Sequence, residues 1–244
     1  MTDLASLNDM NAEALRDAFS GPPAEVARLL RVAAEGGAVE AQLRLGQMAL
    51  DGHGVPPSPV DALRWFGMAA KAGHPMGMNM VGRCLEHGWG TAIDTARAAD
   101  WYRAAADHGL DWGFYNLATL LSLGDGVEKD PARALGLFAK AAALGHAKSI
   151  NMVGSFYEDG WAVTQDRAAA AVHYRRAAEG GDFRGRFNHA RLLIEGGEVD
   201  DALGWLRRVP ESATPRFMAQ MCAWLARQSD PRLCALANEL GLDL

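Results

Sequence analysis

The apolar residues of this chain recur at intervals of three and four, which is the spacing of one face of an α-helix. Within residues 38–73 they form two separate stripes, each long enough for one amphipathic helix. The first stripe comprises Ala41, Leu45, Met48 and Ala49, and the second comprises Ala62, Trp65, Phe66 and Ala69. The pattern therefore predicts a pair of helices in this segment.

Turn-forming residues mark where these two helices begin and end. Gly52 and Gly54 follow the first stripe, and a glycine just past a helix can adopt the left-handed conformation that satisfies the last carbonyls. Ser58 and Pro59 precede the second stripe as a side-chain cap and a proline suited to the first helical position. Gly73 then ends the second helix, so the segment is predicted to be one helix–turn–helix unit.

The same unit recurs every 36 residues. Glycine is the clearest sign, because 27 of the 244 residues are glycine and many of them fall in three fixed phases. These series are Gly37, Gly73, Gly109, Gly145 and Gly181; Gly52, Gly88, Gly124 and Gly160; and Gly54, Gly90 and Gly126, followed by Ala162. Another phase holds only small residues, which would let neighbouring helices approach closely: Ala41, Gly77, Gly113, Ser149 and Gly185.

The repeated unit resembles the Sel1-like repeat, a relative of the tetratricopeptide repeat with a longer loop. The resemblance lies in an Ala-x-x-x-Leu-Gly segment, a Gly-x-Gly-Val turn, an Asp cap and an Ala-x-x-Trp-Phe/Tyr-x-x-Ala-Ala-x-x-Gly segment. The matching units are 38–73, 74–109, 110–145 and 146–181, and 182–213 is a fifth unit with four residues deleted from its loop. The resemblance implies an all-α, right-handed α-solenoid of about five to six helix–turn–helix repeats.

The two ends of the chain are expected to cap this array, because an end repeat would otherwise expose its apolar face. At the N-terminal end, the predicted elements are a capping helix around Ala12–Phe19 within residues 1–23, and the closing helix of an incomplete repeat at 24–37. At the C-terminal end, they are two short helices, 215–228 and 231–240, within residues 215–244. We therefore expect one continuous domain, with the repeats occupying residues 24–214.

Charge and composition exclude several classes of protein. The 24 basic and 30 acidic residues give a net charge of −6, without the basic excess typical of a nucleic-acid binder. Cys84, Cys222 and Cys234 form no disulfide framework. No apolar run approaches the roughly 18 residues that span a bilayer, and the first residues lack the features of a signal peptide. We expect a cytoplasmic protein with no nucleic-acid partner and no membrane insertion.

Motifs for catalysis or metal binding are missing from the sequence. It contains no Ser-x-x-Lys, no Gly-x-Ser-x-Gly and no His-Glu-x-x-His. Some secreted Sel1-like proteins bind or cleave β-lactams, but those carry paired cysteines within their repeats, which this chain lacks. We therefore expect no metal and no cofactor. A hydrolase acting on a cell-wall or β-lactam-like small molecule is the alternative to a binding protein.

The resemblance places the first helix of each unit on a concave face, whose polar residues are candidate contacts to a partner. These candidates are Asn79, Arg83, Tyr115, Asn116, Asn151, Ser155, Arg184, Asn188 and Arg191. Arg184, Asn188 and Arg191 form the sharpest group, because two guanidinium groups beside an amide can bind a carboxylate and a peptide backbone. For any single residue, an ordinary solvated helix face is the alternative.

Two loop tryptophans, Trp89 and Trp161, occupy the same phase two repeats apart. Each could anchor a partner, since tryptophan is enriched at binding hot spots, or fold back over the seam between its own helices. The sequence as a whole predicts a non-catalytic scaffold or adaptor that binds a peptide or helix of another protein on the concave face. Self-association through that face or the C-terminal tail is a further alternative.

Overall fold

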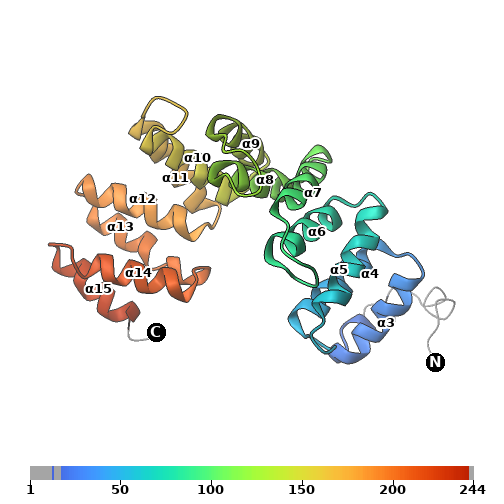
Figure 1. Ribbon diagram of the computed structural model, residues 1–244. Helices are drawn as coiled ribbons and strands as arrows, with labels where there is room; N and C mark the ends of the chain where they lie inside the picture. Colours follow the sequence, from blue (N-terminus) through green and yellow to red (C-terminus); the bar gives the residue numbers. More distant parts are fainter. Residues whose placement is uncertain (1–12, 14–17, 242–244) are drawn as a thin grey trace. The chain divides into compact units, whose positions relative to one another are not determined.

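The computed structural model describes residues 13 and 18–241, and all the regular elements in this part of the chain are helices (Figure 1). The chain forms two compact units, one ending at Asp130 and one beginning at Pro131, which we call unit 1 and unit 2. Unit 1 contains α3 (Pro23–Glu35), α4 (Val39–Asp51), α5 (Pro59–Lys71), α6 (Pro75–His87), α7 (Thr95–Asp107) and α8 (Asp111–Leu123). Unit 2 contains α9 (Pro131–Ala143), α10 (Ala147–Asp159), α11 (Arg167–Glu179), α12 (Phe183–Glu195), α13 (Val199–Leu206), α14 (Pro215–Leu225) and α15 (Pro231–Gly241).

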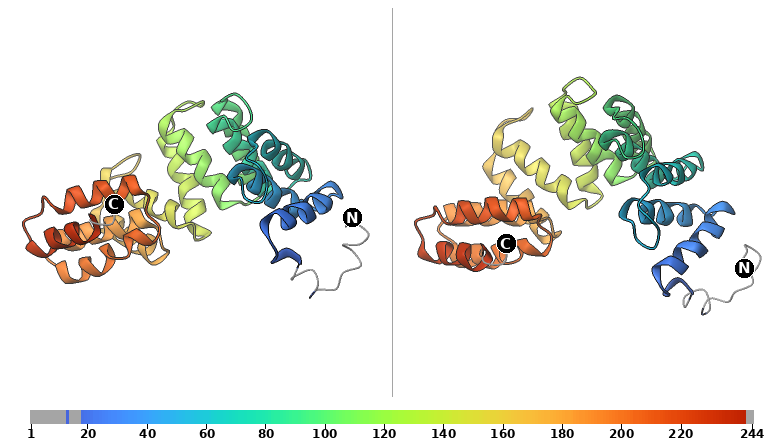
Figure 2. Two further views of the ribbon diagram at one scale, coloured as in Figure 1. Left: turned by 90° about the horizontal axis from the view of Figure 1, so that it is seen from below. Right: turned by 60° about the horizontal axis from the view of Figure 1, so that its bottom comes forward.

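The helices confirm the predicted repeat. Consecutive helices pack side by side from α3 to α8 and from α9 to α13, and α14 packs against α15 (Figures 1 and 2). The first helices α4, α6, α8, α10 and α12 and the second helices α5, α7, α9 and α11 each have 13 residues and recur at the 36-residue period. The fold class is therefore an all-helical solenoid of helix–turn–helix repeats, as the sequence predicts.

The predicted caps form in the expected places. The side chains of Ser58, Asp94 and Asp166 each accept a hydrogen bond from a backbone N–H in the first turn of a second helix. The glycines that end the first helices, such as Gly52 and Gly88, lie in the left-handed region at φ 69° and 72°. Capping side chains and glycines within each repeat thus determine where its helices begin and end.

The fifth repeat departs from the others in its second helix. Helix α13 has only 8 residues, and a short 3₁₀ turn at Val209–Glu211 follows it. Pro210 explains the early end, because proline lacks the N–H that would continue the helical bonding and its ring clashes with the preceding turn. Helix α14 likewise ends at Leu225, three residues before the predicted boundary, and the chain turns before Pro231 begins α15.

Part of the predicted domain organisation stays a prediction. The N-terminal capping helix expected around Ala12–Phe19 lies mostly outside the described residues. The domain boundaries at residues 23 and 214, and the behaviour of the whole array as one continuous domain, are not tested by the division into unit 1 and unit 2.

A single alanine takes the place of a loop glycine in unit 2, and we expect it to carry strain. Ala162 has φ 59°, whereas Gly54, Gly90 and Gly126 at the same phase have φ between 68° and 74°. A side chain in the left-handed region costs about 1–2 kcal/mol, part of which is offset by the chain entropy that glycine loses on folding. Ala162→Gly is therefore expected to raise the free energy of unfolding by up to about 1 kcal/mol.

The measurement is urea denaturation followed by circular dichroism, with Ala139→Gly as the matched control. Ala139 lies exposed within α9 of the same unit, so the same change there should lower stability by about 1 kcal/mol. Equal destabilisation by both changes would show that the Ala162 backbone is not strained.

Candidate functional site

The four predicted asparagines form two equivalent pairs between first helices. Asn116 on α8 donates a hydrogen bond to the side-chain oxygen of Asn79 on α6 at 2.8 Å. In unit 2, Asn188 on α12 donates to Asn151 on α10 at 3.0 Å. Asn79 and Asn151 are buried, whereas their partners are partly exposed. Each pair therefore joins two neighbouring repeats, and Asn116 and Asn188 are the members within reach of a ligand.

A partly buried network surrounds Arg191 in unit 2. Its guanidinium donates to both carboxylate oxygens of Glu158 at 2.7 and 2.6 Å and to Glu195 at 3.0 Å. The hydroxyl of Tyr174 donates to the same Glu158 at 2.7 Å, and it also contacts the Ser155 hydroxyl. Arg191 therefore already holds a carboxylate of its own chain, one repeat earlier.

The pKa values in this network follow from burial and charge. Burial by itself would raise the pKa of Glu158, but the hydrogen bonds from Arg191 and Tyr174 outweigh it and lower the pKa below its ordinary value. Burial and the neighbouring carboxylate raise the pKa of the Tyr174 hydroxyl. Glu158 is thus ionised and Tyr174 protonated near neutral pH, the states in which the network is satisfied.

Arg184 has a different environment from Arg191. It is exposed, and its guanidinium lies 4.5 Å from the centre of the Phe183 ring and 5.8 Å from that of Phe217 on α14. Phe187 contacts Phe217 and Trp224 edge-to-face, with ring centres 5.6 and 5.2 Å apart. The structure thus separates the predicted Arg184–Asn188–Arg191 group into one cation over aromatic rings and one cation inside an ion-pair network.

Phe217 and Trp224 were not among the sequence-predicted site residues. They belong to α14, which the sequence indicates only as a capping helix, because the four deleted residues shift it out of the repeat phase. Aligning α14 with α12 as a further first helix is the signal that would have identified them.

The remaining candidates in unit 1 lie on α6 and α8. Arg83 lies over the Trp89 ring at 5.0 Å, and His87 contacts the same ring at 4.8 Å. Tyr115 packs edge-to-face against Trp112, with ring centres 5.9 Å apart. Trp89 therefore folds against its own first helix.

Trp161 behaves similarly in unit 2 but stays accessible. Its ring contacts Phe156 on its own first helix at 5.6 Å, and 51% of the residue is exposed. Both tryptophans adopt the fold-back arrangement, and a role as a contact anchor stays a prediction for each of them, with Trp161 the more exposed of the two.

Some arginines on the first helices, such as Arg186 and Arg191 of α12, have carboxylate partners, whereas others have none among the described residues. Arg64, Arg103 and Arg175 on second helices each pair with a carboxylate of the same helix. Among the described residues, no carboxylate lies within ion-pair distance of Arg44, Arg83 or Arg184, which project from first helices. We call the surface formed by the first helices of one unit its first-helix face, and these cations give it unpaired positive charge.

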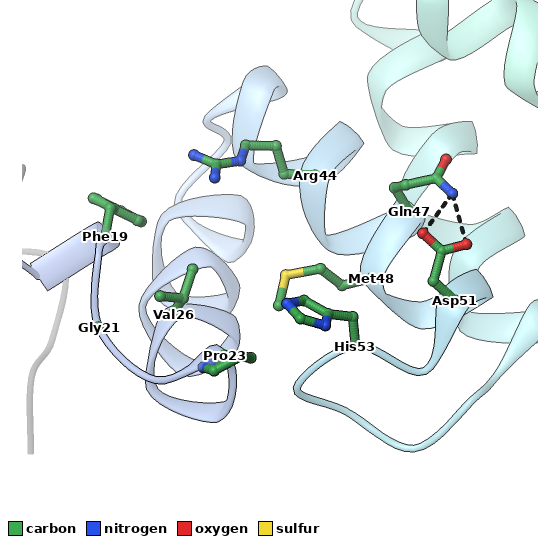
Figure 3. A pocket seen from close by; sticks show the side chains of 9 residues that line it. All are labelled: Phe19, Gly21, Pro23, Val26, Arg44, Gln47, Met48, Asp51 and His53. Atoms are coloured by element: carbon green, nitrogen blue, oxygen red, sulfur yellow. Dashed lines mark hydrogen bonds between the residues drawn. The ribbon is translucent and has the colours of Figure 1, made fainter. Parts of the chain in front are cut away.

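Arg44 also borders a pocket of about 380 Å³ where α3 and α4 meet in unit 1 (Figure 3). Val26 and Met48 supply apolar walls, and the guanidinium of Arg44 extends along one side. Gln47 binds both carboxylate oxygens of Asp51 at 2.9 Å. An unpaired cation beside apolar surface is therefore found in both units, at Arg44 and at Arg184.

Two described groups that could in principle take part in catalysis, the His146–Ser149 pair and Cys84, are buried. The side chains of His146 and Ser149 approach to 2.8 Å, but both residues are buried and the histidine caps α10 through the Ser149 backbone N–H. Burial raises the pKa of Cys84 to about 11, which keeps its thiol protonated and unreactive. No group of three or more potential ligands placed to hold a metal ion occurs in residues 13 and 18–241.

Within the same residues, no helix combines the length and apolar character needed to span a membrane.

The fold and the first-helix faces define a class of protein, the helical repeat solenoids that present rows of side chains from stacked helices. A family model described as the Sel1 repeat matches residues 39–74, 75–110, 115–146 and 147–182, more than half of the chain. The chain therefore belongs to the Sel1 repeat family. Proteins of this family generally act as non-catalytic scaffolds for protein–protein interactions.

Solved structures share the fold of this chain. The protective antigen c5321 of uropathogenic Escherichia coli, which displays an SLR fold, is 25% identical over 91% of this chain, with a TM-score of 0.69. The chain spans 50% of the length of that protein. A Sel1 repeat protein from Oxalobacter formigenes is 23% identical over 90% of this chain and 99% of its own, with a TM-score of 0.73. The immunity protein Pa5087 from Pseudomonas aeruginosa is 19% identical over 93% and 79%, with a TM-score of 0.54. A comparison with curated proteins gives no match.

Proposed function

We propose that this protein is a non-catalytic scaffold that binds an acidic segment of a partner protein on the first-helix face of unit 2. The observation that carries the proposal is Arg184, an exposed guanidinium over aromatic rings with no carboxylate partner among the described residues. An arginine in this position suits a carboxylate, because its planar group lies against the rings while the residue stays exposed to a partner.

Neighbouring groups complete a peptide-binding surface. The half-buried rings of Phe187 and Trp224 offer apolar area for a side chain of the partner. The Asn188 side-chain oxygen has no donor within the described residues, so it can accept a hydrogen bond from a backbone N–H. The Arg184 guanidinium, the two aromatic rings and the Asn188 amide all belong to α12 or α14. A partner segment that lies across these two helices would therefore contact all of them.

The test begins with a displayed library of short linear peptides selected on the intact protein. Enriched peptides are expected to carry acidic residues next to an apolar residue. For a synthetic peptide of that kind, Arg184→Ala is expected to weaken binding about tenfold, which corresponds to one charge-assisted contact. Isothermal titration calorimetry measures the change.

Arg176→Ala is the matched control, because Arg176 is an exposed arginine on the second helix α11 of the same unit. Its removal changes the net charge equally and should leave the affinity unchanged. Equal losses of peptide affinity in both variants would show that the effect comes from net charge alone. Unchanged affinity in Arg184→Ala would mean that the peptide binds elsewhere.

A further inference from the structure

A second open feature lies in unit 2, away from the first-helix face. A cavity of about 480 Å³ opens between the second helices α11 and α13, above residues of α12. Its volume is within the range of pockets that hold small ligands or single side chains of a partner. Its lining includes His189, Leu193, Glu198, Asp201 and Trp205.

The cavity coincides with departures from the repeat pattern. At the phase of His189 the preceding repeats have Leu117 and Val153, which are buried aliphatic core residues. Gly204, in α13, contributes no side chain to the lining, and α13 itself is shorter than the other second helices. A polar imidazole replaces apolar filling where the covering helix is cut short, so the space stays open to a ligand.

One wall of the cavity is formed by two uncharged rings and an aliphatic side chain. The rings of His189 and Trp205 meet edge-to-face with their centres 5.4 Å apart, and Leu193 lines the same cavity. Burial and the neighbouring Arg175 lower the pKa of His189, so the imidazole is neutral at neutral pH. This wall therefore suits the methylene stem of a long side chain and does not repel a positive charge.

The charged groups of the cavity leave an excess of negative charge at its mouth. Arg175 pairs with Glu179 at 3.0 Å, and Arg208 lies over the Trp205 ring within 3.8 Å of Glu211. Glu198 and Asp201 are exposed, and the side-chain carboxylate of neither has an ion-pair or hydrogen-bond partner among the described residues. Although Glu198 stands at the N-cap of α13, its side chain makes no capping hydrogen bond, so its carboxylate is available.

We propose that this cavity binds an arginine side chain of a partner protein. The guanidinium would pair with the carboxylates of Glu198 and Asp201, and its stem would lie along Trp205 and Leu193. Arginine suits the site better than lysine, because its planar group can pair with two carboxylates and stack against an aromatic ring. The proposal is independent of the acidic segment proposed for the first-helix face.

The test uses Nα-acetyl-arginine amide, which presents the side chain as it occurs within a polypeptide, and NMR of the Trp205 indole N–H. The probe is expected to shift this signal saturably, whereas the neutral, nearly isosteric Nα-acetyl-citrulline amide is not. The double change Glu198→Gln with Asp201→Asn is expected to weaken binding at least about tenfold. The matched control is Asp125→Asn with Glu128→Gln, two exposed carboxylates in the loop after α8.

Three results would overturn the proposal. Equal shifts with arginine and citrulline probes would show that charge is not recognised, and this comparison needs no variant to fold. Equal affinity of the two double variants would exclude Glu198 and Asp201. Markedly tighter binding of free arginine than of the blocked amide would identify a pocket for the free amino acid, which the proposal excludes.

Discussion

Replacing Gly113 by alanine is expected to lower the free energy of unfolding of unit 1 by about 2 kcal/mol, the middle of the range for an overpacked core position. A Cβ atom on Gly113 would lie 2.6 Å from the backbone nitrogen of Ala106 and 2.9 Å from the Ala105 carbonyl carbon. These are backbone atoms of α7, so no side-chain rotation can relieve the contact. Helices α7 and α8 would have to separate, which opens the alanine-rich packing between them.

The control for this prediction is the same change at Gly67 in α5 of the same unit. A Cβ atom there would meet nothing within 4 Å, so Gly67→Ala should raise stability by about 0.5–1 kcal/mol through helix propensity alone. Hydrogen exchange of peptides from α7 and α8, measured by mass spectrometry, reports the local free energy. Stabilisation by both changes would contradict the close approach of α7 and α8.

The glycines that recur near the start of the first helices show what can be predicted from the sequence. The period places Gly77, Gly113 and Gly185 in the first turn of first helices, and the structure confirms that each abuts the end of the preceding second helix. Helix limits, caps and these close approaches depend on residues within one repeat or at its seam. They could therefore be predicted from spacing and residue type.

The candidate site was harder to predict because its contacts depend on how neighbouring helices are staggered. The two asparagine pairs join residues 37 apart, one more than the period, so equivalent positions do not face one another. Arg191 reaches Glu158, 33 residues earlier, in the preceding first helix. The position of a residue in the repeat shows which face of its helix it lies on. The residue that it contacts on the neighbouring helix depends on how the two helices pack.

The second large effect concerns Arg191, which the sequence places beside Arg184 as a partner-binding cation. Arg191→Ala is expected to lower the free energy of unfolding of unit 2 by about 2 kcal/mol, because it removes charge-assisted hydrogen bonds to a mostly buried carboxylate. The side chains of Arg191 and Glu158 are only 20% and 18% exposed, so solvent replaces little of what is lost. Urea denaturation, with hydrogen exchange in α10 and α12, measures the loss.

Arg184→Ala is the matched control, since Arg184 is exposed and its contact with aromatic rings contributes about 0.5–1 kcal/mol at most. A double-mutant cycle of Arg191→Ala with Glu158→Gln should give a coupling of at least about 1 kcal/mol. Two assays are then expected to distinguish the two arginines. Arg191 should affect stability, and Arg184 should affect the affinity for an acidic peptide. A stable Arg191→Ala variant that loses peptide binding would reverse these roles, because it would mean that Glu158 leaves the guanidinium free for a partner's carboxylate.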